Sequence, residues 1–374
     1  MKILICGVQF KGGSLQGIVS IIKELVNFPQ HEYYILQYPE IKKQLTHVSF
    51  PSNFHFYDIP LPSKSRILNL YLPRPFFKRM EKEIQPDCVL CTSGPMYWAP
   101  KTPCLMGYNL PQYVYPDSPF FGRISWYKNR RWDFKKAFHR FYLKREGDVF
   151  FVQTDDVRDR AKKYLKTEKV FTIPNTYNTA YRNPETFPNK LPERKKDEVR
   201  LLLFSSYYFH KNIEIIGPVL EELDKKGVTN IRFVLTLPED QYKKIVANIK
   251  FSDRIINVGF VPSKEGPSLY KECDIMFLPT LLECFSASYA EAMIMEKPIL
   301  TSDLSFAHVI CKDAAFYFDP DSPQDIADKI ITMVNDESLR QHLIEKGKQQ
   351  LGQFGTSADR TNAILKLLET ISIN

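Results

Sequence analysis

Two glutamates, Glu283 and Glu291, stand eight residues apart where a predicted apolar strand gives way to a predicted apolar helix. An ionised carboxylate only accepts hydrogen bonds, so a pair of them suits a ligand that offers several hydroxyl groups. Small residues after Glu283 allow a tight turn whose backbone N–H groups, together with the helix start, can hold a phosphate without a metal. These features predict a site for a polyol that carries a phosphate.

Part of this pattern also has a purely structural explanation. Ser288 and Glu291 have the spacing of a capping box, in which the glutamate serves its own helix. That explanation leaves Glu283 without a role, so both interpretations stay open for the pair.

A cation and a glycine-rich stretch could complete an anion site. Lys211 falls near the start of a predicted helix, where the helix dipole disfavours a cation by roughly 0.3–1 kcal/mol unless an anion such as a diphosphate is bound there. A solvated surface lysine is the alternative. The stretch from Gly7 to Gly17 can bring the backbone close to a phosphate or sugar, or form an ordinary turn, and it lacks the G-x-G-x-x-G dinucleotide fingerprint.

The elements that must position these residues alternate between short apolar runs and amphipathic helical patterns, which predicts parallel sheets covered by helices. Ligands bind such sheets at the carboxyl ends of the strands, and each candidate stretch follows a predicted strand. The predicted strands are 2–6, 33–37, 87–91, 148–152, 199–204, 231–235, 254–260, 274–278 and 297–301.

We therefore predict an α/β protein with two doubly wound, Rossmann-like domains that face each other across a cleft. A proline-rich, charged stretch without apolar periodicity marks the boundary. The expected division is a first domain over 1–180, a linker over 181–198, a second domain over 199–355, and a C-terminal helix over 356–374 that packs back on the first domain.

Composition and charge narrow the class of protein. The chain of 374 residues is 44% hydrophobic and 25% charged, which is typical of soluble globular proteins. No stretch of about 18 apolar residues is present to span a membrane. The seven scattered cysteines, without a secretion signal, indicate reduced thiols in a cytoplasmic protein. Residues 1–190 carry a net charge of +13 and the remainder −5, so the two halves have different surfaces.

The stretch "LLECFSASYAEAMIMEKPIL", which holds both glutamates, resembles the E-x7-E signature of retaining glycosyltransferases of the GT-B fold, family 4 (group 1). The similarity extends over roughly residues 200–335. In the first half it is weaker and rests on "GGSLQG", "FVQT" and "VFTIPNTYN".

The resemblance implies a role for each matching residue. Lys211 would bind the donor diphosphate, Glu283 would lie beside the transferred sugar, and Glu291 would bind the nucleotide ribose. The other implied donor contacts are Phe285, Ser286 and Ala287 at the distal phosphate, Gly12 and Gly13 from the first domain, and Gly259, Phe260 and Val261 near the base.

The chain departs from the family in three places. Ser206 stands where the family usually has an arginine, which weakens the diphosphate clamp. Cys284-Phe285-Ser286 replaces the usual Gly-Phe-Gly. Asn109 stands where many members carry a histidine, so it is the candidate contact for the acceptor or the sugar.

The implied function is retaining transfer of a hexose from a nucleotide-diphosphate sugar to a saccharide or lipid-linked acceptor, in polysaccharide or glycolipid biosynthesis. Lys211 and Glu283 are the catalytic candidates, and no cofactor or metal is expected. The sole Asp-x-Asp, Asp319 to Asp321, falls in a proline turn. The alternatives are a nucleotide-sugar epimerase of the same architecture and a catalytically weakened nucleotide-sugar-binding protein.

Residues 123–145 interleave nine lysines and arginines with seven aromatic residues and one acid. Such a segment can stack nucleic-acid bases, lie on an anionic membrane, or pack its rings on its own domain. Given the resemblance, we expect the inner face of the cell membrane rather than nucleic acid. The candidate membrane contacts are Trp126, Arg130, Arg131, Trp132, Lys135 and Lys136.

Overall fold

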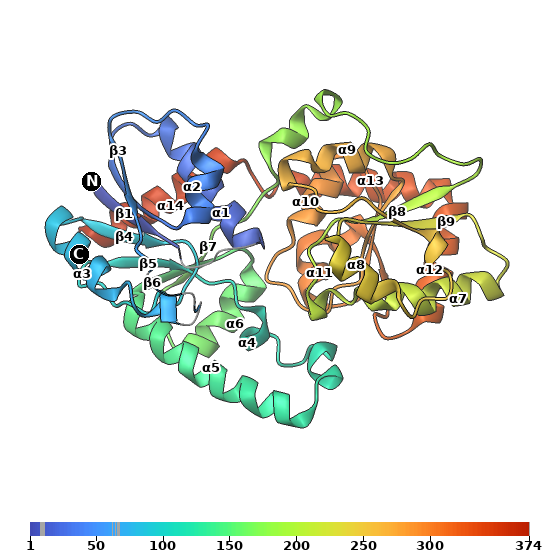
Figure 1. Cartoon of the computed structure of the whole chain (residues 1–374), viewed down its shortest axis with the longest axis horizontal. Helices are drawn as coiled ribbons and strands as arrows, with labels where there is room; N and C mark the ends of the chain where they lie inside the picture. The colour runs from blue at the N-terminus through green and yellow to red at the C-terminus, as the bar shows by residue number, and fades with distance from the viewer. Residues whose placement is uncertain (8–11, 62, 64, 66–67, 374) are drawn as a thin grey trace. The chain divides into compact units, whose positions relative to one another are not determined.

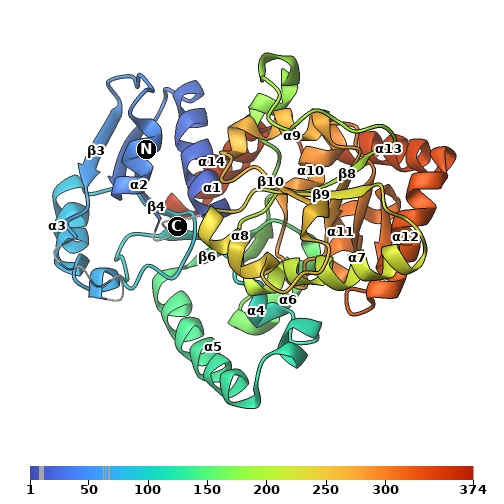
Figure 2. The ribbon, with the colours of Figure 1, turned by 45° about the vertical axis from the view of Figure 1, so that its right-hand side comes forward.

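The computed structural model describes residues 1–7, 12–61, 63, 65 and 68–373, so part of the glycine-rich stretch, residues 8–11, lies outside the described residues. The chain forms two compact units, each built on one sheet (Figure 1 and Figure 2). The first unit comprises Met1–Pro116, Ile124–Asn175 and Thr356–Asn374. The second comprises Asp117–Arg123 and Thr176–Gly355.

The first unit contains a seven-stranded parallel sheet in the order β3-β2-β1-β4-β5-β6-β7. Central strands β4, β5 and β6 are buried along their whole length, as expected when helices cover both faces of a parallel sheet. The strands are β1 Lys2–Cys6, β2 Glu32–Gln37, β3 Phe54–Asp58, β4 Cys88–Cys91, β5 Cys104–Gly107, β6 Val149–Val152 and β7 Val170–Thr172.

The helices of this unit include the last helix of the chain. They are α1 Gly12–Glu24, α2 Pro39–Leu45, α3 Arg74–Ile84, α4 Pro111–Val114, α5 Trp126–Glu146, α6 Asp155–Leu165 and α14 Ser357–Ser372. Helix α14, drawn in red in Figure 1, packs on α1 and contacts β4 and β5. Its residues Ile364, Leu365 and Leu368 belong to the core of the first unit.

The second unit contains a six-stranded parallel sheet in the order β10-β9-β8-β11-β12-β13. Its strands are β8 Val199–Leu203, β9 Ile231–Leu235, β10 Ile255–Asn257, β11 Ile275–Leu278, β12 Ile299–Ser302 and β13 Ala315–Phe318. Its helices are α7 Ile216–Lys225, α8 Glu239–Val246, α9 Gly266–Glu272, α10 Ala287–Ile294, α11 Ser305–Cys311, α12 Pro323–Asn335 and α13 Glu337–Leu351. Helix α7 packs on α12, and α10 packs on α13.

The predicted α/β class with two parallel sheets is confirmed, whereas four strands were not predicted from the sequence. These are β3, β5, β7 and β13. The units also divide the chain differently from the predicted domains: residues 117–123 group with the second unit, as does the predicted linker, which contains the short 3-10 helix η5 Pro184–Thr186. None of the helices built from described residues is long and apolar enough to cross a membrane.

Candidate functional site

The strand order brings the loops of Lys211 and Glu283 together. Strands β8 and β11 are neighbours, although 71 residues lie between the end of β8 and the start of β11, because the strand order reverses between them. In open α/β sheets the crevice at such a reversal is where ligands bind. Lys211 follows β8 and Glu283 follows β11, so both lie beyond the carboxyl ends of this strand pair.

Lys211 and Glu283 form an ion pair. The ammonium group of Lys211 donates a hydrogen bond to Oε1 of Glu283, and each side chain is only 12% exposed. The buried hydroxyl of Thr280 lies 3.0 Å from the same oxygen. Two donors therefore hold one oxygen of Glu283, and its Oε2 remains available to accept a further hydrogen bond.

Lys211 lies close to a helix start, as predicted, but outside the helix. Lys211 ends a short 3-10 helix, η6 Phe209–Lys211, and a second one, η7 Ile213–Ile215, runs directly into α7 at Ile216. Asn212, between them, has a left-handed backbone with φ of 56°. The carboxylate of Glu283, rather than an anion at a helix start, balances the charge of Lys211 in this structure.

Two contacts tie the loops after β8 and β11 to each other. The amide of Leu281 donates to the carbonyl of His210 at 2.7 Å, and the hydroxyl of Thr280 lies 3.2 Å from that carbonyl. Burial lowers the pKa of His210 below its ordinary value, with Glu283 raising it and Lys211 lowering it further. The imidazole is therefore neutral at pH 7, and Lys211 is the cation of this loop pair.

Glu291 occupies a different environment from Glu283. It lies on α10, is 4% exposed, and its carboxylate is 3.4 Å from the hydroxyl of Tyr270. The hydroxyl of Tyr181 also affects this carboxylate but makes no hydrogen bond of normal geometry. Burial raises the pKa of Glu291 to about 7, and the two tyrosines oppose that rise.

The capping-box explanation of Glu291 is wrong. Helix α10 begins at Ala287, and its N-cap residue is Ser286, which makes no side-chain cap. The hydroxyl of Ser288 instead lies 3.4 Å from the carbonyl of Phe204. Because Ser288 is inside the helix and Glu291 faces tyrosines, Glu291 does not serve the start of its own helix.

The remaining donor-site candidates of the second unit lie at three loops. Phe285 packs edge-on against Phe354 with 5.7 Å between ring centroids, and Ser286 and Ala287 start α10, where N–H groups lack helical partners. In the loop after β10, Gly259 has φ of 74° and Phe260 is 72% exposed, whereas Val261 is buried. Ser206 is exposed after β8.

In the first unit, Asn109 is held by two serines. Its amide nitrogen donates to the Ser14 hydroxyl at 2.6 Å, and its amide oxygen accepts from the Ser93 hydroxyl at 2.9 Å. Gly12 and Gly13 are the first residues of α1, and a Cβ on Gly13 would meet nothing within 4 Å. This end of the first sheet thus presents neutral polar groups, with open space beside Gly13.

Helix α5 exposes a stripe of rings. Trp126, Tyr127, Phe134 and Phe141 are 71%, 66%, 74% and 59% exposed, and the last three follow each other at seven-residue spacing. Two of the predicted membrane contacts are half-buried and pack on the first unit: Trp132 packs edge-on with Tyr113, and the Lys136 ammonium lies 5.7 Å from the ring centroid of Tyr164. Arg130, Arg131 and Lys135 are exposed.

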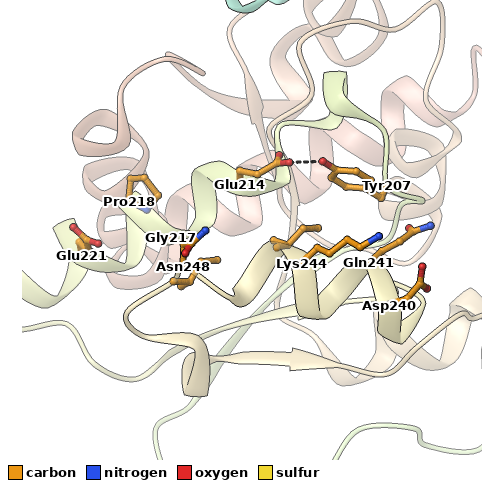
Figure 3. A pocket seen from close by; sticks show the side chains of 11 residues that line it. Tyr207, Glu214, Gly217, Pro218, Glu221, Asp240, Gln241, Lys244 and Asn248 are labelled. Carbon is orange, nitrogen blue, oxygen red and sulfur yellow. Dashed lines mark hydrogen bonds between the residues drawn. The ribbon is translucent and has the colours of Figure 1, made fainter.

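A separate cavity of about 640 Å³ lies between α7 and α8 (Figure 3). Tyr207, Glu214, Asp240, Gln241 and Lys244 are among its lining residues, and the Tyr207 hydroxyl donates to Glu214 at 2.6 Å. No residue of the predicted site lines this cavity. The Lys211–Glu283 pair is therefore distinct from it.

Sequence reasoning missed several side chains that touch the two glutamates or the loop of Lys211, four of which matter most here. Thr280, Tyr270 and Tyr181 contact the carboxylates, and Arg123 contacts Asn212. Thr280 lies three residues before Glu283 and could have been weighed as its partner. The tyrosines and Arg123 come from distant parts of the sequence and carry no local signal. Among the described residues, no cluster of three or more metal-ligating side chains is present.

Residues 185–350 match the family model described as glycosyl transferases group 1. An uncharacterised glycosyltransferase of Methanocaldococcus jannaschii is 24% identical over 158 residues, which cover 41% of this chain and 43% of that protein. The O-antigen chain mannosyltransferase B of Escherichia coli is 27% identical over 107 residues, which cover 29% and 28% of the two chains. The matched segments span less than half of the length of these relatives.

The whole chain resembles a solved structure in fold. HepE of Anabaena in complex with UDP-glucose is similar over 99% of this chain and 100% of that chain, with a TM-score of 0.73 and 15% identity. This likeness shows the fold, which is the GT-B arrangement of two parallel α/β sheets. The family match and the sequence resemblance agree, since residues 185–350 match the glycosyl transferases group 1 model and the resemblance noted from the sequence covers roughly residues 200–335.

Proposed function

We propose that the protein is a retaining glycosyltransferase that moves a hexose from a nucleotide-diphosphate sugar to a hydroxyl of a saccharide or lipid-linked acceptor. The observation that carries the proposal is the Lys211–Glu283 ion pair at the strand reversal, next to the start of α10. The family match over residues 185–350 supports sugar transfer. HepE binds UDP-glucose, and a relative is an O-antigen chain mannosyltransferase, which supports a nucleotide sugar and a polysaccharide or glycolipid pathway.

The diphosphate is the part of the donor that these groups fit best. Lys211 has three N–H donors and uses one on Glu283, so the others can bind phosphate oxygens. The N–H groups and dipole of α10 favour an anion at Phe285 to Ala287. An ammonium and backbone amides stabilise the charge of the departing diphosphate, so we expect no metal requirement.

The two glutamates would contact the sugar and the ribose. Oε2 of Glu283 can accept from a hydroxyl of the transferred sugar while Oε1 stays with Lys211 and Thr280. A carboxylate held by two donors is a poor nucleophile, because both hydrogen bonds stabilise its charge. We therefore favour attack of the acceptor on the same face that the diphosphate leaves over a covalent intermediate on Glu283. Glu291 would bind the ribose.

Exposed rings on α5 favour a membrane-bound acceptor. Tyr127, Phe134 and Phe141 form one stripe, since seven residues span two helical turns, and Arg130 and Arg131 are exposed nearby. Rings at headgroup depth beside cations suit an anionic lipid surface. We propose that the enzyme works in the cytoplasm, in peripheral contact with the inner face of the cell membrane.

Donor transfer is tested by a thermal-shift screen of nucleoside diphosphates and nucleotide sugars, followed by donor-hydrolysis assays on the hits. Release of a nucleoside diphosphate with retention of the anomeric configuration, followed by NMR, is expected. An inverted product would contradict retention. An isomerised nucleotide sugar without diphosphate release would indicate an epimerase, and binding without turnover a weakened binding protein.

Membrane contact is tested by sedimentation with vesicles of anionic or neutral lipid at low salt. We expect binding to anionic vesicles that weakens at least about tenfold when Tyr127, Phe134 and Phe141 are all changed to alanine. Phe171→Ala is the matched control, because Phe171 is an exposed ring on β7 of the same unit. Equal binding to neutral and anionic vesicles would show that the exposed cations do not contribute to membrane binding.

A further inference from the structure

Seven residues from the first half of the sequence belong to the second unit. Asp117–Arg123, here called the 117–123 clamp, lies in the sequence between α4 and α5 but groups with residues 176–355. Most of it is the 3-10 helix η3 Pro119–Arg123. It contacts the two loops that hold Lys211 and Glu283, and it also contacts Pro320 and Asp321 in the loop after β13.

Arg123 is bound to three groups at once. Its Nε donates to Oδ1 of Asp321 at 3.0 Å, its Nη2 donates to the Pro320 carbonyl at 3.0 Å, and its Nη1 donates to the side-chain oxygen of Asn212. The amide nitrogen of Asn212 donates to the same Pro320 carbonyl at 3.2 Å. Both ends of the buried Asn212 amide are therefore held, one residue after Lys211.

Phe120 and Ser118 hold the same loops from the other end of the clamp. The ring of Phe120 is buried, with its centroid 5.9 Å from Phe209 and 6.5 Å from His210. The hydroxyl of Ser118 donates to the Leu281 carbonyl at 2.6 Å. The clamp thus touches the loop before Lys211, the residue after it, and the loop that leads to Glu283.

The loop of Lys211 needs such support because it has little regular structure of its own. Residues Phe209–Lys211 form a single 3-10 turn, and the left-handed Asn212 follows. One 3-10 turn is weak in isolation. A left-handed asparagine costs on the order of 1 kcal/mol unless its surroundings fix it. The turn and Asn212 set the position of the Lys211 ammonium group, so contacts that hold them also fix where this charge would meet the donor.

We propose that the 117–123 clamp positions the Lys211–Glu283 pair for the donor, and that Arg123 is its principal positioning residue. Only the expected effect on catalysis rests on the proposed function. The effect on the position of the loops does not depend on it. Arg123 acts through Asn212 and Lys211 rather than on the substrate itself.

Hydrogen–deuterium exchange of the ligand-free full chain tests the physical part without reference to activity. In Arg123→Ala we expect the amides of Lys211, Asn212 and Leu281 to exchange at least about tenfold faster, because their loops open more often. Arg123→Lys should fall between, since a lysine can reach Asp321 but cannot also hold Asn212 and Pro320. Unchanged exchange at all three amides in Arg123→Ala would overturn the proposal.

Arg194→Ala is the matched control for the exchange experiment. Arg194 also joins a carboxylate and a carbonyl across two segments of the second unit, donating to Asp274 at 2.8 Å and to the Glu272 carbonyl at 2.7 Å. It does not touch the loops of Lys211 or Glu283. Faster exchange at Lys211 in this variant as well would mean that the unit loosens generally, and would overturn a specific role for Arg123.

A double-mutant cycle tests the catalytic part, with UDP-glucose as the first probe and the donor selected by the thermal-shift screen as the second. We expect Arg123→Ala to lower kcat/KM about tenfold in the wild-type background and less than about twofold in a Lys211→Ala background, because Arg123 acts through Lys211. An equal loss in both backgrounds, or none in the wild type, would overturn the positioning role. If the wild type turns over no nucleotide sugar, the proposed function fails, while the exchange result still decides whether the clamp holds the loop.

Discussion

The two glutamates of the 283–291 segment have opposite electrostatic environments. Glu283 shares an oxygen with the ammonium of Lys211 and the hydroxyl of Thr280. Glu291 is buried against Tyr270 and Tyr181, and burial raises its pKa to about 7. One carboxylate is stabilised as an anion by a cation, and the other is held partly protonated by its surroundings.

The contrast shows that the spacing of two glutamates in a motif does not reveal whether each carboxyl group is charged or neutral. A pair of carboxylates can divide into a charged group and a neutral group when one has a cationic partner and the other does not. In the proposed function, the charged glutamate would lie where the sugar and the diphosphate separate. The buried glutamate can both donate and accept near neutral pH, which would suit the ribose proposed as its partner.

The largest effect should follow removal of the cation. Lys211→Ala should lower donor turnover by about 100- to 1000-fold, as loss of one donor to a developing anion does in other enzymes. The measurement is kcat with the donor found in the screen, alongside the unfolding temperature. Lys225→Ala removes an exposed lysine paired with Glu222 and serves as the control.

A second variant separates catalysis from folding. Lys211→Ala leaves Glu283 without its cation, so the variant is also expected to unfold at a lower temperature. Adding Glu283→Gln should restore the unfolding temperature but not turnover. Recovery of turnover in the double variant would show that Lys211 matters only for structure.

The next effect is a pH dependence of stability that comes from Glu291. The folded-state pKa of Glu291 is about 7 against an ordinary 4.5, so the folded state binds more protons than the unfolded state between these values. The contribution of Glu291 to stability should therefore fall as the pH rises from about 4.5 to about 7, by up to roughly 3 kcal/mol, and stay constant above that range.

Glu291→Gln isolates this contribution. Burial also raises the pKa of Glu146, to about 8, so this residue likewise makes stability fall as the pH rises. Measurements on the wild type alone therefore cannot separate the effect of Glu291 from that of Glu146. The difference in unfolding free energy between wild type and Glu291→Gln should shrink as the pH falls toward 4.5. A difference that does not vary from pH 5 to 8 would contradict a buried, protonatable Glu291.

A smaller effect is expected at the glycine that makes room for Tyr181. A Cβ on Gly266 would lie 2.0 Å from the Tyr181 hydroxyl and 2.6 Å from the ring of Phe204. Gly266→Ala should therefore destabilise the protein by about 1–3 kcal/mol, as overpacking does. Gly352→Ala, with 3.6 Å to its nearest neighbour, is the control measured in the same thermal-unfolding series.

The Tyr181→Phe background sharpens the test. The hydroxyl of Tyr181 has no hydrogen-bond partner and is the atom nearest the added methyl group, so its removal should lower the cost of Gly266→Ala. If Gly266→Ala destabilises the Tyr181→Phe variant as much as the wild type, the methyl group clashes with Phe204 instead. Gly266 would then not affect the surroundings of Glu291.

Much of the fold follows from local pattern, because buried parallel strands are continuous apolar runs. The predicted strand 2–6 coincides with β1, and the predicted strand 231–235 with β9. Strand β5 was missed because its four residues follow a proline and end in a glycine. Strand β3 was missed because its aromatic residues lie in a polar context at the edge of the sheet.

The candidate residues of the site could be named from the sequence, but the side chains that contact them could not. Lys211, Glu283 and Glu291 stand out by type and by family resemblance. The pairing of Lys211 with Glu283 joins residues 72 apart and exists because β8 and β11 are neighbours. Arg123 reaches the same loops from the first half of the sequence. Such contacts depend on tertiary structure, which short-range periodicity does not encode.

The smallest effect should come from Thr280, the neutral partner of Glu283. Its hydroxyl lies 3.0 Å from Oε1 of Glu283, and Thr280→Val removes that donor while nearly keeping the shape. Loss of one hydrogen bond to a charged group costs about 1.5 kcal/mol, or roughly tenfold in donor turnover if the bond orients Glu283.

Thr301→Val is the matched control, since Thr301 is equally buried and donates to the Leu278 carbonyl at 2.8 Å. Both variants should lose stability, but only Thr280→Val should lose turnover, because Thr301 bonds the backbone of β11 and not a glutamate. Equal turnover in the two variants would mean that Lys211 alone orients Glu283. The difference in environment between Glu283 and Glu291 would then come from Lys211 and not from Thr280.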